Sequence, residues 1–216
     1  MATYESLIKL NGSLGDLVFY NLNGKNIVRK KSGFNKNAFK KSPSYEKVRQ
    51  NSSEFGHCSK IGKIIRQCLE VYIKKSDDAL LYQRFAKLMT EIKDLDAISE
   101  KGKRCVKNGL LTEHGMQLLK KFQFGLIENL ENSASIFEGL WDKSLVLNKD
   151  ISFDELIIET INIDFDHYQS DHFKQTIQTE KLLNEYVFEK YFSEEELLLH
   201  FVVLKKEGEI AHMGFV

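Results

Sequence analysis

The run Glu-Thr-Ile-Asn-Ile-Asp-Phe at residues 159–165 alternates polar and apolar side chains along the chain. A period of two is typical of a half-buried β-strand, with the isoleucines on one face and the polar side chains on the other. Similar strand-like runs with turn signals between them surround it. They lie at residues 144–147, 155–165, 186–191, 197–205 and 209–216. Residues 140–216 are therefore predicted to form an antiparallel, β-rich, sandwich-like domain.

A helical segment is predicted upstream, over residues 43–139. Ser42 can cap free backbone amides, and Pro43 suits the first helical position because its missing N–H would be unpaired there. Apolar residues then recur at spacings of three and four, which is typical of one helix face. They are Val48, Phe55, Cys58, Ile61, Ile65, Cys68, Leu69 and Tyr72. Further helices are expected after Ser76, more weakly over residues 95–106, and over residues 113–121 behind a Thr112 cap.

The N-terminal residues 6–31 predict a three-stranded antiparallel meander. Strands are expected at residues 6–10, 17–21 and 26–31, and residues 11–16 supply turn residues. Asn23-Gly24 predicts a two-residue hairpin turn, because a type I′ turn needs positive φ at both positions. The lysine-rich residues 30–42 are expected to form an extended connector. The chain is thus predicted to be α+β, divided into residues 1–42, 43–139 and 140–216.

Two stretches carry a resemblance to a known group of proteins. The first runs from Ile8 to Tyr20 as Ile-Lys-Leu-Asn-Gly-Ser-Leu-Gly-Asp-Leu-Val-Phe-Tyr and continues through Gly24-Lys25 to Val28-Arg29-Lys30-Lys31. The second runs from Val48 to Gly56 as Val-Arg-Gln-Asn-Ser-Ser-Glu-Phe-Gly. Together they resemble uncharacterised cytoplasmic proteins of Bacteroidota. The resemblance implies a glycine-bounded hairpin, a basic linker, a helical segment and a C-terminal β-rich domain, and it implies no activity.

Charge is segregated along the chain although the formal net charge is zero. Residues 1–107 contain 22 basic and 11 acidic residues, whereas residues 108–216 contain 9 basic and 20 acidic residues. Three cysteines without Cys-x-x-Cys spacing argue against a disulfide framework and a zinc site. The N-terminus does not resemble a secretory signal, and no run of about 18 apolar residues is present. We therefore expect a cytoplasmic protein with no membrane association.

Basic residues interleaved with aromatic ones form the candidate binding site. Side chains of this kind can hold a phosphate backbone while the rings stack on bases, or they can meet a protein partner. The alternative is a solvated connector that its charge keeps exposed. The candidate residues are Lys30, Lys31, Phe34, Lys36, Phe39, Lys40, Lys41, Lys47, Arg49, Lys60, Lys63 and Arg66.

The leading hypothesis is a non-catalytic interaction or assembly protein whose basic half binds another protein or another copy of itself. The second hypothesis is association with nucleic acid through residues 30–66. A third is a metal-dependent enzyme, since carboxylates and imidazoles, which can bind a divalent metal, occur at short spacing at Asp164, Asp166, His167, Asp171 and His172. That spacing fits no recognised site and is also typical of a polar loop, so we assign no metal ligands, catalytic residues or cofactor. The sequence does not decide whether the chain is an enzyme, and it favours a protein without catalytic activity.

Overall fold

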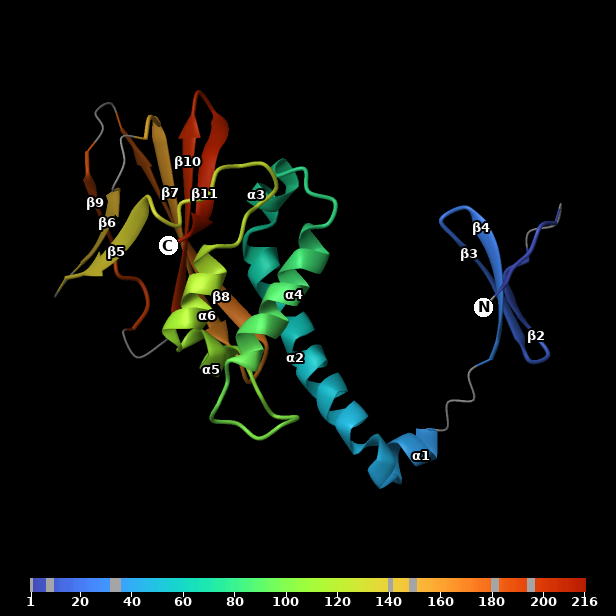
Figure 1. Cartoon of the computed structure of the whole chain (residues 1–216). Coiled ribbons are helices and arrows are strands. Elements are labelled where there is room, and N and C mark those ends of the chain that lie inside the picture. The colour runs from blue at the N-terminus through green and yellow to red at the C-terminus, as the bar shows by residue number, and fades with distance from the viewer. Residues whose placement is uncertain are drawn as a thin grey trace. The chain divides into compact units, whose positions relative to one another are not determined.

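The structure is a computed structural model and describes residues 2–6, 10–31, 36–139, 142–147, 151–179, 183–193 and 197–216. The chain divides into two compact units, an N-terminal unit of residues 1–46 and a C-terminal unit of residues 47–216. Helices and antiparallel sheets both occur, so the predicted α+β class is confirmed (Figure 1). Among the described residues, no helix is long and apolar enough to cross a membrane.

A four-stranded antiparallel sheet in the order β1-β4-β3-β2 makes up most of the N-terminal unit. Its strands are β1 (Ala2–Thr3), β2 (Gly12–Leu14), β3 (Leu17–Leu22) and β4 (Lys25–Lys30). The predicted β3–β4 hairpin is confirmed, because Asn23 and Gly24 have φ of 51° and 79°. The sheet differs from the predicted meander at its edges, since β1 adds a fourth strand.

The predicted strand over residues 6–10 is not observed at Ser6 or Leu10, and residues 7–9 lie outside the described ranges. Instead β2 occupies part of the predicted turn, because Gly12 to Leu14 pair with β3 and leave only Gly15 and Asp16 to reverse the chain. The lysine-rich connector also differs from prediction. Its second part forms the helix α1 (Lys36–Lys41), in agreement with the good helix propensity of lysine and alanine.

Five helices belong wholly or largely to the C-terminal unit. They are α2 (Glu46–Cys68), α3 (Glu70–Lys75), α4 (Leu81–Asp94), α5 (Val106–Leu110) and α6 (Glu113–Lys120). A short 3-10 turn, η1 (Pro43–Tyr45), precedes α2, and Ser42 forms no side-chain cap there. The predicted Thr112 cap is confirmed, since its hydroxyl accepts a hydrogen bond from the Gly115 amide at 3.0 Å.

Two antiparallel sheets complete the C-terminal unit. The large sheet has the order β11-β10-β7-β8, and the small sheet has the order β5-β6-β9. The large sheet consists of β7 (Glu155–Asp164), β8 (Gln169–Gln178), β10 (Leu198–Lys206) and β11 (Glu209–Phe215). The small sheet consists of β5 (Ala134–Glu138), β6 (Lys143–Leu147) and β9 (Glu185–Phe188). The helices cover one face of the large sheet and the small sheet covers the other (Figure 1).

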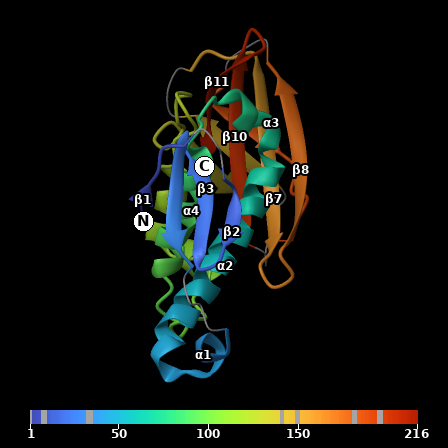
Figure 2. The same ribbon diagram turned by 90° about the vertical axis from the view of Figure 1, so that its right-hand side faces the viewer.

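Two cores lie on opposite faces of the large sheet. Ile157 and Ile161 of β7 pack with the helices, whereas Leu156 and Ile158 pack with the small sheet. Alternate side chains of one strand therefore serve different layers, as the pleat requires. Figure 2 views the helix side of this sheet, with α2 and α3 in front of it. The helical and β-rich segments consequently share one continuous unit.

Three expectations for this unit are wrong. Val48 and Phe55 were expected on the buried face of α2, but Phe55 is 62% exposed and Val48 is also exposed, because the first half of α2 extends beyond the sheet (Figure 1). Residues 95–105 are not helical and are held by side-chain contacts to Glu54 and Asp96. The sequence Asp171-His172, interpreted as part of a loop, lies within the strand β8.

Candidate partner-binding surface

One face of the N-terminal sheet exposes a row of apolar side chains beside a lysine. Leu14 pairs with Leu17, and Leu17 pairs with Lys30, so these three side chains lie across β2, β3 and β4 on the same face. Leu14 is 73% exposed and Leu17 is 42% exposed. Phe19 follows Leu17 on this face and contacts Tyr4 edge-on at 5.7 Å between ring centroids. We call Leu14, Leu17, Phe19 and Lys30 the N-terminal face.

The N-terminal sheet has almost no core of its own. Among the described residues of this unit, Ile27 is the only buried one. The opposite face also exposes Leu22, and the Arg29 guanidinium lies 6.0 Å from the Tyr20 ring. Small sheets are stable when a face packs against another layer, and this sheet leaves apolar side chains on both faces in water.

Most lysines of the candidate site are exposed. Those at positions 30, 31, 36, 40, 41 and 47 form no ion pair with any residue in the described ranges. Phe39 is half-buried and contacts Tyr45 at 5.8 Å between ring centroids, so it packs locally. Phe34 lies outside the described residues. The structure thus leaves the six lysines at positions 30, 31, 36, 40, 41 and 47 accessible.

The basic residues on α2 do not form one stripe. At about 100° per residue, Lys60 and Lys63 lie about 60° apart, whereas Lys47 lies about 140° from Lys60. Lys60 is placed with its ammonium 4.3 Å from the centre of the Tyr168 ring, and Arg49 is half-buried. Only part of the predicted set on this helix can therefore face a single partner.

Arg66 takes part in packing between helices. Its guanidinium lies 4.9 Å from the Tyr82 ring centre and 5.6 Å from that of Phe85. Burial lowers the pKa of this guanidinium, and its Nε is buried without a hydrogen-bond partner. Arg66 thus joins α2 to α4 through cation–π contacts, a role that its place in a basic pattern did not indicate.

Positive and negative halves do not neutralise each other through the ion pairs that the structure describes. Where both partners lie in the described ranges, each pair joins residues within 1–107 or within 108–216. Lys93–Glu54 and Lys205–Glu155 are examples from the two halves. These ion pairs therefore do not join the basic half to the acidic half. A separation of positive and negative charge of this kind can steer association with a charged partner.

Glu54 is the centre of a buried ion cluster that sequence reasoning did not find. The Lys93 ammonium donates to it at 2.8 Å, the Arg104 guanidinium donates two bonds at 2.9 and 2.7 Å, and the Gly102 amide donates at 2.6 Å. The Arg104 hydrogen bonds are the main reason that the pKa of Glu54 falls to about 2, and Lys93 contributes. The cluster joins α2, α4 and residues 102–104, so its role is structural.

A second buried polar group lies between the two sheets. His200 of β10 lies 3.1 Å from the Thr160 hydroxyl through Nδ1 and 3.3 Å from the Lys143 ammonium through Nε2. Lys143 also pairs with Glu138 at 2.5 Å. Burial, with the Lys143 charge, lowers the pKa of His200 to about 4. The imidazole is therefore neutral near pH 7, and its Nε2 accepts the hydrogen bond from Lys143.

His57 also has a packing role. Its Nε2 accepts a hydrogen bond from the Val106 amide at 3.0 Å, and its Nδ1 lies 3.2 Å from the Tyr168 hydroxyl. Burial lowers the pKa of this imidazole, and Lys60 adds to the effect. The ring thus connects α2 with the start of α5 and with the β7–β8 turn.

The predicted acid–histidine cluster is not assembled into a set of metal ligands. Asp164 accepts hydrogen bonds from the amides of Asp166 and His167 and pairs with the His167 ring at 2.7 Å. Asp171 and His172 are neighbours on β8 and point to opposite faces. Within the described ranges, no group of three His, Cys, Asp or Glu side chains could hold a metal ion.

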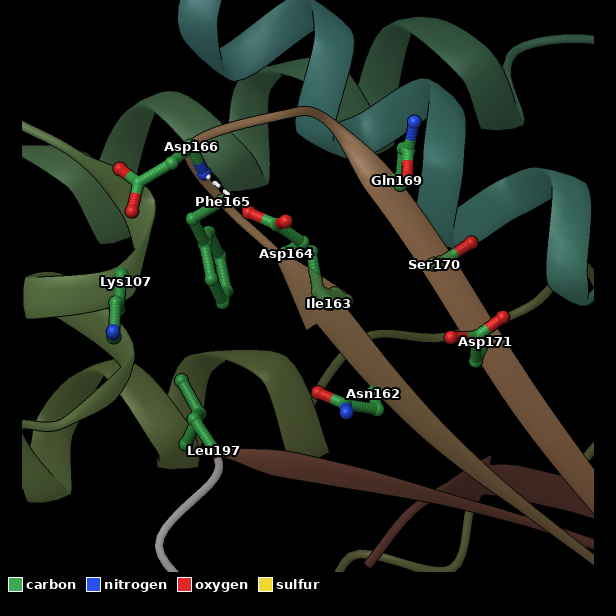
Figure 3. Close-up of a pocket in the computed structure, with 10 residues that line it drawn as sticks. All are labelled: Lys107, Asn162, Ile163, Asp164, Phe165, Asp166, Gln169, Ser170, Asp171 and Leu197. Carbon is green, nitrogen blue, oxygen red and sulfur yellow. Dashed lines mark hydrogen bonds between the residues drawn. The ribbon is translucent and has the colours of Figure 1, made fainter. Parts of the chain in front are cut away.

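A polar cavity of about 300 Å³ lies where β7 turns into β8. Figure 3 shows Lys107 and Asp166 at one side of it and Ser170 and Asp171 on β8 at the other. The Ser170 hydroxyl lies 3.3 Å from the Cys68 thiol. The Asp164 carboxylate accepts hydrogen bonds from amides within the turn. Among the described residues that line the cavity, no nucleophile is held by a general base.

No protein-family profile, curated protein or solved structure matches this chain.

Proposed function

We propose that this chain is a non-catalytic interaction or assembly protein that binds another protein, or another copy of itself, through its basic N-terminal half. The observation that supports the proposal is the small N-terminal sheet, in which Ile27 is the only buried residue among those described while Leu14 and Leu17 face water. A sheet of this size gains stability when one face packs on a further layer. A partner that binds only the folded sheet supplies that layer and stabilises the fold by mass action.

Charge supports the same proposal. The exposed lysines of residues 30–47 attract an acidic surface, which raises the association rate and selects the partner. Such contacts are screened by salt, with a Debye length of about 8 Å at physiological ionic strength. Binding through this segment should therefore weaken as salt is added, whereas the apolar part of the contact should not.

Hydrogen exchange of the full chain over a dilution series tests this function. If the chain associates with itself, the amides of residues 10–31 should be protected from exchange at high concentration. They should lose that protection at the dilution at which light scattering shows the chain to be monomeric. The β7 and β10 amides serve as an internal control and should stay protected throughout. For a different protein partner, the N-terminal amides should exchange rapidly in the monomer at every concentration. Slow exchange of these amides in a dilute monomer would show that the sheet needs no partner and would contradict the proposal.

A second candidate is association with nucleic acid. It is favoured by the exposed lysines at positions 30, 31, 36, 40, 41 and 47, which form no ion pair with described residues. Phosphate contacts of this kind give a steep, linear dependence of log affinity on log salt. Fluorescence anisotropy with generic DNA and RNA measures that slope, and the absence of binding at low salt would eliminate this candidate.

A further inference from the structure

The small sheet of the C-terminal unit has one face in the core and an opposite face that carries exposed apolar side chains among the described residues. Its inner face contributes Leu145, Tyr186 and Phe188 to the core against the large sheet. Its outer face carries Phe137, which is 59% exposed, and Val187, which is 56% exposed. The outer layer of an antiparallel sandwich is usually polar, so the exposed Phe137 and Val187 on this layer are candidates for contact with a partner.

The register of the small sheet brings these outer residues together. Phe137 pairs with Ser144, and Ser144 pairs with Val187, so the three form one row across β5, β6 and β9. The neighbouring row on the same face consists of Ser135, Val146 and Glu185, in which Val146 pairs with both of the others. We call Phe137, Val146, Val187 and Glu185 the outer face. Glu185 is exposed and forms no ion pair with a described residue.

The outer face and the N-terminal face are complementary in chemistry and in length. Both faces carry exposed apolar side chains on antiparallel sheets, and β3 and β4 have six residues each while β5 and β6 have five. The N-terminal face carries Lys30 at its margin, and the outer face carries Glu185. Two such faces can pack as the layers of a sandwich, about 10 Å apart, with opposite charges at the rim.

We infer that the outer face of the sheet β5-β6-β9 is the docking surface for the N-terminal sheet of a second copy of this chain. The inference rests on the proposed function and adds the identity of the partner and of its receiving surface. Because the two faces differ, each copy supplies one of each, and the contact is head-to-tail. The segregation of charge between residues 1–107 and 108–216 favours this orientation over contact between like faces.

Complementation between two single variants tests the inference. Leu17→Asp places a charge in the N-terminal face, and Val187→Asp places one in the outer face. Both positions are exposed, so each variant should keep its far-ultraviolet circular dichroism and the melting temperature of its C-terminal unit. Each variant alone should associate more than about tenfold more weakly than the natural chain. Their equimolar mixture should form a one-to-one dimer by light scattering, since one intact face of each kind remains.

Val71→Asp is the matched control. Val71 is an exposed apolar residue on α3, outside both faces, so the same change of chemistry there should leave association unaltered. A mixture that stays monomeric while the natural chain associates would overturn the inference. So would a natural chain that is monomeric at every concentration.

The remaining outcomes separate the inference from the proposed function. If Leu17→Asp abolishes association and Val187→Asp does not, the receiving surface lies elsewhere, and the N-terminal unit still has an assembly role. If both variants associate as the natural chain does, neither face takes part. Self-association through the N-terminal face is then refuted together with the inference.

Discussion

Replacing Glu54 by glutamine should lower the free energy of unfolding by about 3–5 kcal/mol near pH 7, the usual cost of breaking a buried ion pair from one side. The glutamine amide retains one acceptor oxygen and turns an NH₂ group toward Lys93 and Arg104, which are themselves donors. Glu54 is only 3% exposed, so water cannot replace the lost acceptor.

The pKa of Glu54 gives an independent figure of similar size. Its folded value of about 2 lies below the usual 4.5, and each unit of difference corresponds to about 1.4 kcal/mol, giving about 3 kcal/mol. Because the folded pKa is the lower one, this stability is fully present above about pH 4.5 and is lost as the pH falls towards 2. Glutamine does not titrate, so the difference between the two proteins should shrink by about 2 kcal/mol between pH 7 and pH 3.

Urea unfolding followed by circular dichroism, at pH 7 and at pH 3, measures both effects. Glu91→Gln is the control, because Glu91 forms an exposed ion pair with Lys87 and should contribute no more than about 0.5 kcal/mol. A loss below about 1 kcal/mol for Glu54→Gln at pH 7, or an equal loss at both pH values, would refute the reasoning.

Three further outcomes are expected. Gly109→Ala should destabilise the C-terminal unit by about 3 kcal/mol in urea unfolding, since a Cβ there would lie 2.0 Å from the Ile92 carbonyl oxygen. Gly56→Ala, a change in a helix with open space around it, should instead be neutral or stabilising by up to about 1 kcal/mol. Tyr72→Phe should cost about 1–3 kcal/mol, because it removes the hydroxyl that donates to Glu159 at 2.6 Å and leaves a buried carboxylate unpaired; the double change with Glu159→Leu should recover much of that loss. His200 is neutral in the fold with a pKa of about 4 against 6.5 unfolded, so stability should fall by up to about 3 kcal/mol as the pH drops from about 6.5 to 4, and His200→Gln should flatten that part of the pH profile.

The spacing of apolar residues in the sequence correctly predicted a strand and a helix of the C-terminal unit. The alternation in residues 159–165 identified β7, and the apolar spacing after Ser76 identified α4, because both strand and helix bury one consistent set of residues. β8 was missed because it is an edge strand with exposed polar residues, and its sequence carries no apolar alternation of comparable strength. Phe55 was misplaced because spacing indicates a helix face but cannot show where the sheet beneath it ends.

The candidate site was foreseeable only in part. The exposed lysines of residues 30–47 are visible in the sequence as a charge run, and the structure leaves them accessible. The packing role of Arg66 and the cluster around Glu54 depend on contacts between residues far apart in sequence, such as Glu54 and Arg104, which are 50 positions apart. The outer face could not be predicted either, since it depends on the register of β5 and β9 on β6.

The alternation of β7 between two cores also restricts how this protein can change over evolution. Neighbouring side chains such as Glu159 and Thr160 meet different chemical surroundings, one next to Tyr72 and the other next to His200. Deleting a single residue within the strand would exchange the two sets along the rest of its length. We therefore expect insertions and deletions among natural variants at surface turns such as Glu207-Gly208, and a constant length for β7.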